Sequence, residues 1–214
     1  MTKPMSIAIV SDVVCPWCVI GIRALDVALE RLDGLAADIT LHPFELNPAM
    51  AREGENVAEH IAKKYGRAPG EGGAIRDEIK RRAAEVGFAM NTGSDSRIWN
   101  TFDCHRLLHW ASEQGRQRAL KHALFVTHFS EGRDLGDHGV LTEAAVAAGL
   151  DPIEAAAVLA EGRYANEVRA ELEYWRREGV QAVPTFIING KYVISGGHPP
   201  EAFERALGKI AAEG

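Results

Sequence analysis

Two cysteines with two residues between them, in Cys15-Pro16-Trp17-Cys18, are the strongest candidates for chemistry in this chain. They follow a short apolar run, 7–10, and precede an amphipathic segment, 19–32. This order predicts a strand leading into a helix that begins at the first cysteine. Unpaired backbone N–H groups and the helix dipole favour negative charge there, which lowers the pKa of a thiol and favours the nucleophilic thiolate. Because Cys18 lies one helical turn further on, the motif indicates dithiol–disulfide chemistry at Cys15 and Cys18.

The two residues between the cysteines suit this reading. Pro16 fits the first turn of a helix, where its missing N–H costs nothing. We expect Pro16 and Trp17 to tune the stability of the thiolate through their shape and through the amides that point at the sulfur.

Zinc binding is the main alternative for a CxxC motif. A structural zinc site takes four ligands, usually as two pairs. The chain has three cysteines and eight histidines, and no histidines are spaced to complete a second pair with Cys104. We therefore predict no metal site. Cys104 is most simply a small buried hydrophobic residue.

The composition excludes several classes of protein. Of 214 residues, 46% are hydrophobic and 25% charged, and the net charge of −6 argues against a nucleic-acid-binding surface. No apolar run approaches the ~20 residues of a membrane span. The first residues show no signal-peptide pattern before the first expected strand. We therefore expect a cytoplasmic protein with no nucleic-acid or membrane partner, in which a CxxC is more often catalytic or metal-binding than a structural staple.

The elements that must position the cysteines lie at the two ends of the chain. Residues 38–42 alternate as a second strand, and strand, helix and strand make a crossover unit with parallel strands. Near the C-terminus, apolar runs at 185–188 and 192–195 flank Asn189-Gly190, which predicts a type I′ hairpin. A last helix is expected at 201–211.

The middle of the chain predicts helices almost throughout 57–178. They are expected at 57–65, 74–86, 101–114, 117–130, 139–148, 152–160 and 165–178, with a Gly- and Pro-rich loop at 67–73. The strands at the two ends could belong to unrelated pieces or to one sheet. An isolated hairpin is marginal in water, so we favour one sheet, formed by 1–50 and 179–214, with 51–178 as a helical insertion.

Val183 and Pro184 stand immediately before the strand at 185–188. A proline often does no more than start a strand. A sharper interpretation is a cis Val183–Pro184 bond, which is rare outside particular turns. If it faced the CxxC motif, the backbone of Val183 could pair with an extended peptide as an added strand.

Taken together, these motifs resemble the DsbA family of thioredoxin-fold oxidoreductases, and most closely its cytoplasmic FrnE-like branch. The matching blocks run in order across nearly the whole chain, at 11–18, 43–48, 100–107, 183–186 and 194–200. The resemblance implies an α/β thioredoxin fold with an all-α insertion. It implies Cys15 as the attacking thiol, Cys18 as the resolving thiol, and Val183-Pro184 as the substrate-facing loop.

The implied activity is thiol–disulfide exchange or isomerisation. The expected partners are disulfide- or thiol-containing peptides or proteins, or glutathione as a redox partner, with no tightly bound cofactor, in a monomer or a homodimer. The same fold group includes glutathione-dependent isomerases and kappa-class glutathione transferases, which carry a serine-type position in place of Cys15 and lack the paired thiols. A non-catalytic binding module with an inert CxxC is a third possibility.

Two further residues have two interpretations each. Asp12, three residues before Cys15, could accept a proton from the buried thiol, or could be a turn or N-cap residue. His105 lies on a predicted helix that we expect to border the active-site groove. It could stabilise the Cys15 thiolate, or it could pack in the core of the insertion.

Overall fold

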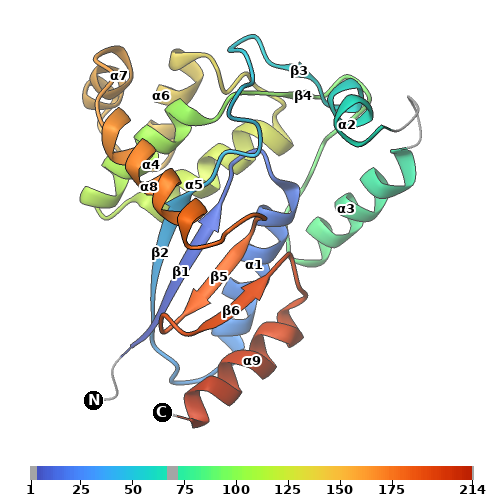
Figure 1. Cartoon of the computed structure of the whole chain (residues 1–214), viewed down its shortest axis with the longest axis vertical. Coiled ribbons are helices and arrows are strands. Elements are labelled where there is room, and N and C mark those ends of the chain that lie inside the picture. The colour runs from blue at the N-terminus through green and yellow to red at the C-terminus, as the bar shows by residue number, and fades with distance from the viewer. Residues whose placement is uncertain (1–3, 67–71, 214) are drawn as a thin grey trace.

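A four-stranded sheet built from both ends of the chain forms the base of the protein. The structure is a computed structural model, and it describes residues 4–66 and 72–213. The strand order is β2-β1-β5-β6 (Figure 1). Strand β1 (Met5–Ser11) pairs in parallel with β2 (Ala37–Pro43) and antiparallel with β5 (Thr185–Ile188), which pairs with β6 (Tyr192–Ser195). This topology confirms the prediction of one sheet and of an α/β thioredoxin fold.

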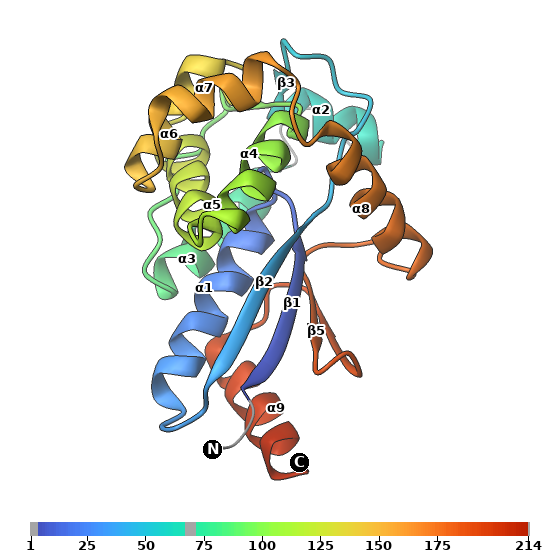
Figure 2. The same ribbon diagram turned by 90° about the vertical axis from the view of Figure 1, so that its left-hand side faces the viewer.

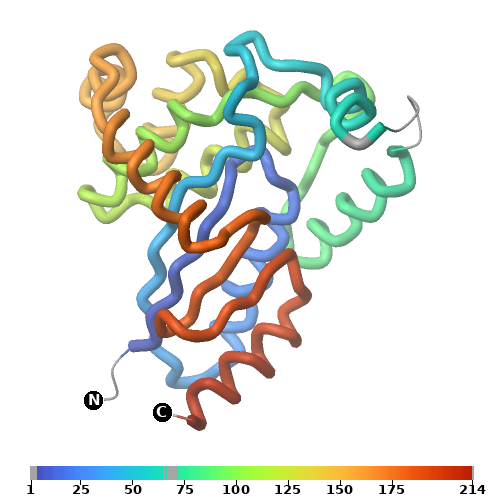
Figure 3. The backbone as a smooth tube through the Cα atoms, viewed as in Figure 1, coloured from blue at the N-terminus to red at the C-terminus, as the bar shows by residue number. Residues whose placement is uncertain are grey.

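The hairpin at the C-terminal end has the predicted turn. Asn189 and Gly190 have φ angles of 52° and 65°, and positive values at both central residues define type I′. The turn brings β6 back along β5, and the backbone tube shows β5 between β1 and β6 (Figure 3). The sheet therefore joins segments that are far apart in the sequence.

Two helices pack against each other beside the sheet (Figure 2). They are α1 (Pro16–Arg31) and α9 (Pro200–Ala212). The ring of Phe203 on α9 meets the ring of Phe186 on β5 edge-on, with centroids 4.8 Å apart. Both rings are fully buried, and they lie in a continuous sheet core that also contains Cys15 and Cys18.

The chain between β2 and β5 is mainly helical, as predicted. Helices α4 to α8 gather beyond one end of the sheet, and α3 packs against α1 (Figures 1 and 2). The bounds are α2 Val57–Tyr65, α3 Gly73–Glu85, α4 Phe102–Glu113, α5 Gln117–Phe125, α6 His138–Ala147, α7 Pro152–Ala160 and α8 Ala165–Arg177. A second core, the helical core, joins α4 to α7, and Val13 and Val14 enter it from the segment before Cys15. The active-site segment is therefore held by both cores.

The structure corrects the sequence prediction in two places. A short ladder joins β3 (Glu55–Asn56) to β4 (Arg97–Ile98), and two-residue strands are too short for alternation to reveal. The predicted helix at 117–130 changes at Phe125 into a π-helix, Val126–Ser130, closed by Glu131 N–H donating to Val126 O at 3.0 Å. Residues 67–71 of the predicted loop lie outside the described part of the chain.

Candidate active site

Cys15 lies where the sequence predicts it, at the N-terminus of α1. It is the N-cap residue, with extended backbone angles, and Pro16 is the first helical residue. The N–H of Cys18 donates to Cys15 O at 3.0 Å, which closes the first turn over the motif. Cys15 is 4% exposed and Cys18 is fully buried, and both are free thiols. Of the two sulfurs, Cys15 is thus the one closer to the surface.

The Val183–Pro184 peptide bond is cis, as predicted. The thiol of Cys15 donates to Val183 O at 3.6 Å, so the two segments meet although 168 positions separate them. Gly21 allows this approach: a Cβ there would lie 3.0 Å from the ring of Phe186 and 3.1 Å from Pro184. The sequence prediction of a contact between the CxxC motif and Val183-Pro184 is confirmed in its geometry.

Trp17 packs against Gly197, in the loop that follows β6. A Cβ on Gly197 would be 2.9 Å from Trp17 O, which requires glycine at that close approach. Arg82 of α3 donates to Gly197 O at 3.0 Å, and its guanidinium lies 5.7 Å from the centre of the Trp17 ring. The insertion therefore contacts the active-site motif through α3.

Asp12 is fully buried and is the first residue after β1. Its Oδ2 accepts from Leu46 N–H at 2.8 Å, whereas its Oδ1 has no hydrogen-bond partner in the described part of the chain. Burial alone would raise the pKa of Asp12, but His105, the Leu46 N–H and the charge of Lys121 outweigh it, so the pKa lies below its ordinary value. Asp12 is therefore a buried carboxylate whose Oδ1 makes no hydrogen bond in the described part of the chain and lies 3.5 Å from His105 Nε2.

His105 reaches the site through Asp12. It is 3% exposed, its Nε2–H donates to Phe44 O at 2.9 Å, and the same nitrogen lies 3.5 Å from Asp12 Oδ1. Phe44 and Asp12 are its hydrogen-bond and ion-pair partners in the described chain, so the structure gives no support to a direct contact with the Cys15 thiolate. His105 instead joins the carboxylate to the segment that follows β2.

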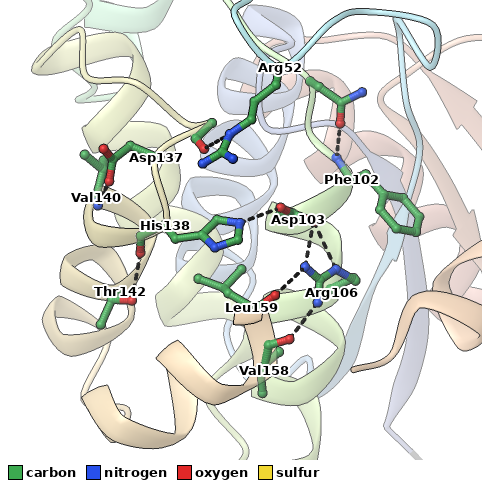
Figure 4. Close-up of polar contacts among 12 residues, drawn as sticks. Arg52, Phe102, Asp103, Arg106, Asp137, His138, Val140, Thr142, Val158 and Leu159 are labelled. Atoms are coloured by element: carbon green, nitrogen blue, oxygen red, sulfur yellow. Dashed lines mark hydrogen bonds and ion pairs between the residues drawn. The ribbon is translucent and has the colours of Figure 1, made fainter. Parts of the chain in front are cut away.

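The residue after His105 anchors its helix (Figure 4). Arg106 is 4% exposed and donates to Val158 O at 2.6 Å and to Leu159 O at 3.2 Å, in the last turn of α7. It also donates to Asp103 at 2.7 Å, and Asp103 accepts from His138 at 2.8 Å. A cation at a helix C-terminus satisfies carbonyls that have no partner within the helix. Arg106 thus fixes α4, and with it His105.

The two other thiols differ from Cys15 in their surroundings. Burial raises the pKa of Cys18 well above its ordinary value, with a further increase from Cys15 and an opposing effect of Lys121. Cys104 is fully buried, and burial raises its pKa strongly. Both should stay protonated at neutral pH in the reduced protein. Cys104 fits the predicted buried hydrophobic residue.

Sequence reasoning missed two buried basic residues beside this site. Lys121 on α5 is 2% exposed, and its Nζ is 3.4 Å from Ser11 O. His128 in the π-helix is 8% exposed, and burial lowers its pKa to about 4. A signal for Lys121 exists in the sequence, because Leu124 and Phe125 follow it at the spacing of one helical face. A lysine on an apolar face is a candidate buried cation.

In residues 4–66 and 72–213, no three or more His, Cys, Asp or Glu side chains form a group suited to a metal ion. None of the helices in those ranges has the length and apolarity needed to cross a bilayer.

The fold and the position of the CxxC motif define a thioredoxin-fold protein of the oxidoreductase type. Residues 6–208 match the family described as the DSBA-like thioredoxin domain, and the chain belongs to that family. The match spans the sheet and the helical insertion together. The general resemblance found in the sequence is confirmed, while the FrnE-like branch stays a prediction.

Individual relatives cover almost the whole chain. The probable DsbA oxidoreductase SCO1869 from Streptomyces coelicolor has 37% identity and a TM-score of 0.91, over 98% of this chain and 91% of that one. The uncharacterized protein YwbO of Bacillus subtilis (strain 168) is 29% identical over 94% of each chain. The cytosolic disulfide reductase DsbM from Pseudomonas aeruginosa, also solved with GSH, has a TM-score of 0.61 at 19% identity, over 98% of this chain and all of that one. At that identity the likeness concerns the fold alone.

Proposed function

We propose that this protein is a dithiol–disulfide oxidoreductase in which Cys15 and Cys18 form the redox pair. The observation that carries the proposal is the setting of Cys15. Its sulfur lies at the N-terminus of α1, contacts Val183 O at 3.6 Å, and has a buried cysteine one turn behind it. Helix N-termini favour the thiolate, which is the attacking species in disulfide exchange.

The proposed reaction has two exchange steps. The Cys15 thiolate attacks one sulfur of a substrate disulfide, a Cys15–substrate disulfide forms, and the other substrate sulfur leaves as a thiolate. Cys18 then loses its proton, its sulfur attacks Cys15 Sγ, and the second substrate sulfur leaves with the electron pair of the broken bond. The substrate gains two electrons and the Cys15–Cys18 pair loses two. The reverse sequence oxidises a substrate dithiol.

Asp12 is the proposed proton acceptor for Cys18. Its buried Oδ1 makes no hydrogen bond in the described chain and lies 3.5 Å from His105 Nε2, so it keeps a lone pair that can take a proton. The backbone of Asp12 opposes the rise in the pKa of Cys18 that burial causes, so Asp12 acts on the resolving thiol. Pro16 and Trp17 shape the turn between the sulfurs.

The proposed substrates are peptides, proteins or small molecules that carry a disulfide or a thiol. An extended peptide could pair with the backbone of Val183 beside the Cys15 sulfur. Glutathione is a proposed redox partner, bound transiently and not as a resident cofactor, and the GSH complex of DsbM supports the idea at the level of a shared fold. We also propose a cytoplasmic site of action, which agrees with the name of DsbM as a cytosolic protein of the same fold.

Reduction of insulin disulfides tests the proposal. We expect Cys15→Ser to abolish the activity, because Cys15 is the N-cap residue of α1, whereas Cys18 and Cys104 are fully buried. The matched control is Cys104→Ala, which removes a fully buried thiol outside the motif and should keep the activity.

Two outcomes would contradict the proposal. Full activity in Cys15→Ser would show that Cys15 is not the nucleophile. Glutathione-dependent isomerase or transferase activity that survives the loss of both Cys15 and Cys18 would favour the other chemistry of this fold group.

A further inference from the structure

Helix α8 leads directly into the loop that faces Cys15, yet it is lightly packed (Figure 1). Of its 13 residues, Val168 is the one that is buried. Glu171, Leu172 and Trp175 are half-buried at the spacing of the same helical face, and most of the other residues of α8 are exposed. A helix attached along one narrow face depends on the few contacts made there.

Glu171 is the polar residue of that face, and its two oxygens reach two different elements. Its Oε1 accepts from Nδ1–H of His42, on β2, at 2.5 Å, and its Oε2 lies 3.9 Å from Nδ1 of His109, on α4. An ionised carboxylate can only accept, so the proton of the shorter contact belongs to His42. The side chains of Glu171 and His42 are 27% and 21% exposed, so water reaches this contact only in part.

His42 is itself held in place, so it can anchor the helix. The hydroxyl of Thr40 lies 3.1 Å from Nε2 of His42, on the side of the ring away from Glu171. The ring of Trp175 packs on the same imidazole, with centroids 4.7 Å apart. One histidine of the sheet therefore receives α8 at two positions, a carboxylate and an indole.

The C-terminal end of α8 is joined closely to the loop that follows it. Gly179 has a φ of 84°, and its N–H donates to Arg176 O at 3.1 Å, while Val180 N–H donates to Trp175 O at 3.0 Å. These two bonds and the left-handed glycine form a Schellman cap. Val180 is buried against the end of the helix, and two residues separate it from Val183. The backbone of Val183 therefore follows the position of α8.

The other end of the same loop is held by the sheet. Gly196 N–H, after β6, donates to Pro184 O at 2.8 Å. The Cys15 sulfur, 3.6 Å from Val183 O, belongs to α1 and is placed independently of α8. A shift of α8 would thus move the backbone of Val183 and leave Cys15 where it is.

We propose that Glu171 is a positioning residue for peptide substrates: by binding His42 it holds α8, and through α8 it holds the Val183–Pro184 loop. This rests on the proposed function, in which an extended peptide pairs with the backbone of Val183 while its disulfide meets Cys15. Glu171 touches neither the substrate nor a sulfur. Its effect falls on substrates that use the loop, and a small disulfide without peptide groups is insensitive to it.

The test compares two substrates on the same variants. Glu171→Ala should raise the KM for a peptide disulfide about threefold to tenfold, within the range of coupling through packed neighbours. It should leave kcat unchanged, because binding is lost equally before and in the transition state. The rate with a small aromatic disulfide should match that of the wild type. Glu171→Gln keeps an oxygen that accepts from His42, so it should restore the KM.

Hydrogen exchange gives a second measurement that needs no substrate. The amides of 179–183 should exchange faster in Glu171→Ala than in the wild type, because a loosened helix end opens the loop more often. Glu173→Ala is the matched control, since it makes the same change at an exposed position of the same helix. It should change neither the KM nor the exchange of the loop.

Three outcomes would overturn the proposal. The first is a wild-type KM for the peptide in Glu171→Ala, and the second is a failure of Glu171→Gln to restore the KM. The third is an equal loss with the peptide and the small disulfide, which would place the effect on Cys15 itself. A wild-type protein that exchanges disulfides with neither substrate would overturn the proposed function instead, and faster exchange in Glu171→Ala would still show that Glu171 holds the loop.

Discussion

The sheet and the helical insertion contribute different things to the active site. The sheet half, formed by the segments before 51 and after 178, supplies the two sulfurs, because Cys15 and Cys18 lie at the start of α1. It also supplies Val183, just before β5. The helical half supplies basic groups, His105 from α4, Lys121 from α5 and His128 from the π-helix. His105 and Lys121 both lower the pKa of the Asp12 carboxylate.

This difference suggests what the insertion is for. A CxxC motif at the start of a helix needs only the strand, the turn and the helix to place its sulfurs. The buried charge beside it needs compensation from outside that unit, because an unpaired buried carboxylate is costly. In this protein the compensation comes from helices between β2 and β5. The insertion thus adjusts the electrostatics of a site whose geometry the sheet half provides.

We expect the largest change in stability from deletions in the sheet core and in the helical core, and only the first should also change Cys15 reactivity. Phe186→Ala should cost about 3–5 kcal/mol of unfolding free energy and should also slow attack by Cys15, because the Phe186 ring packs near Gly21 and Phe203 under the motif. Leu141→Ala, a matched deletion in the helical core, should cost about 2–5 kcal/mol with unchanged Cys15 reactivity. Urea titration measures the unfolding free energy. Cys15 reactivity is measured with a chromogenic aromatic disulfide, which releases one coloured thiolate when Cys15 attacks and a second when Cys18 resolves the mixed disulfide. The rate of the first release is compared between the variants. Equal losses of reactivity in both variants would erase the distinction.

The next effect concerns acid stability. The pKa of His128 falls from 6.5 to about 4 in the folded protein, so below pH 6.5 the unfolded chain binds a proton that the folded chain does not. Stability is therefore lost as the pH falls from 6.5 toward 4, by up to roughly 3 kcal/mol. The lowered pKa of Asp12 adds a loss only at more acidic pH, below its ordinary value of 3.8.

Urea midpoints measured at neutral pH and near pH 4 check this prediction. His128→Gln has no titrating ring and should lose clearly less stability between the two conditions. If the variant and the wild type lose the same amount, His128 is not the group that sets acid sensitivity in this range.

The smallest change in free energy is expected for the rate at which Cys18 resolves the mixed disulfide, when Asp12 is replaced. Asp12→Asn keeps the side-chain shape but removes the proposed proton acceptor, so the second thiolate release should slow by about tenfold to a hundredfold, while the first changes less. Asp26→Asn makes the same change on α1 at a partly exposed ion pair with Arg118 and should leave both releases unchanged. A wild-type second release in Asp12→Asn would mean that the proton goes elsewhere.

The strands and turns of the sheet half were predicted well, because each has a local sequence signal with few alternative explanations. Two short apolar runs around Asn189-Gly190 leave few alternatives to a type I′ hairpin. A proline directly before a strand raised the cis bond as a specific possibility, and the structure has it. The contact between Cys15 and Val183 followed once both ends were assigned to one sheet.

The helical half was predicted at the level of elements but not of contacts. The helical face that Lys121 shares with Leu124 and Phe125 indicates burial, but it does not indicate which groups the lysine meets there. Lys121, Arg106 and His128 are buried because of neighbours distant in the sequence. His105 was expected near the site, yet its partners, Phe44 and Asp12, depend on how α4 lies against the segment after β2. The π-helix also had no separate signal in a continuous helical pattern.

Trapping the intermediate tests the central claim most directly. Reduced Cys18→Ser protein is mixed with a peptide disulfide, and its intact mass and the modified residue are determined by mass spectrometry, with Cys15→Ser treated in parallel. We expect one peptide attached through a disulfide to Cys15 in Cys18→Ser, and no adduct in Cys15→Ser. An adduct that persists in Cys15→Ser, or one found on Cys104, would contradict it.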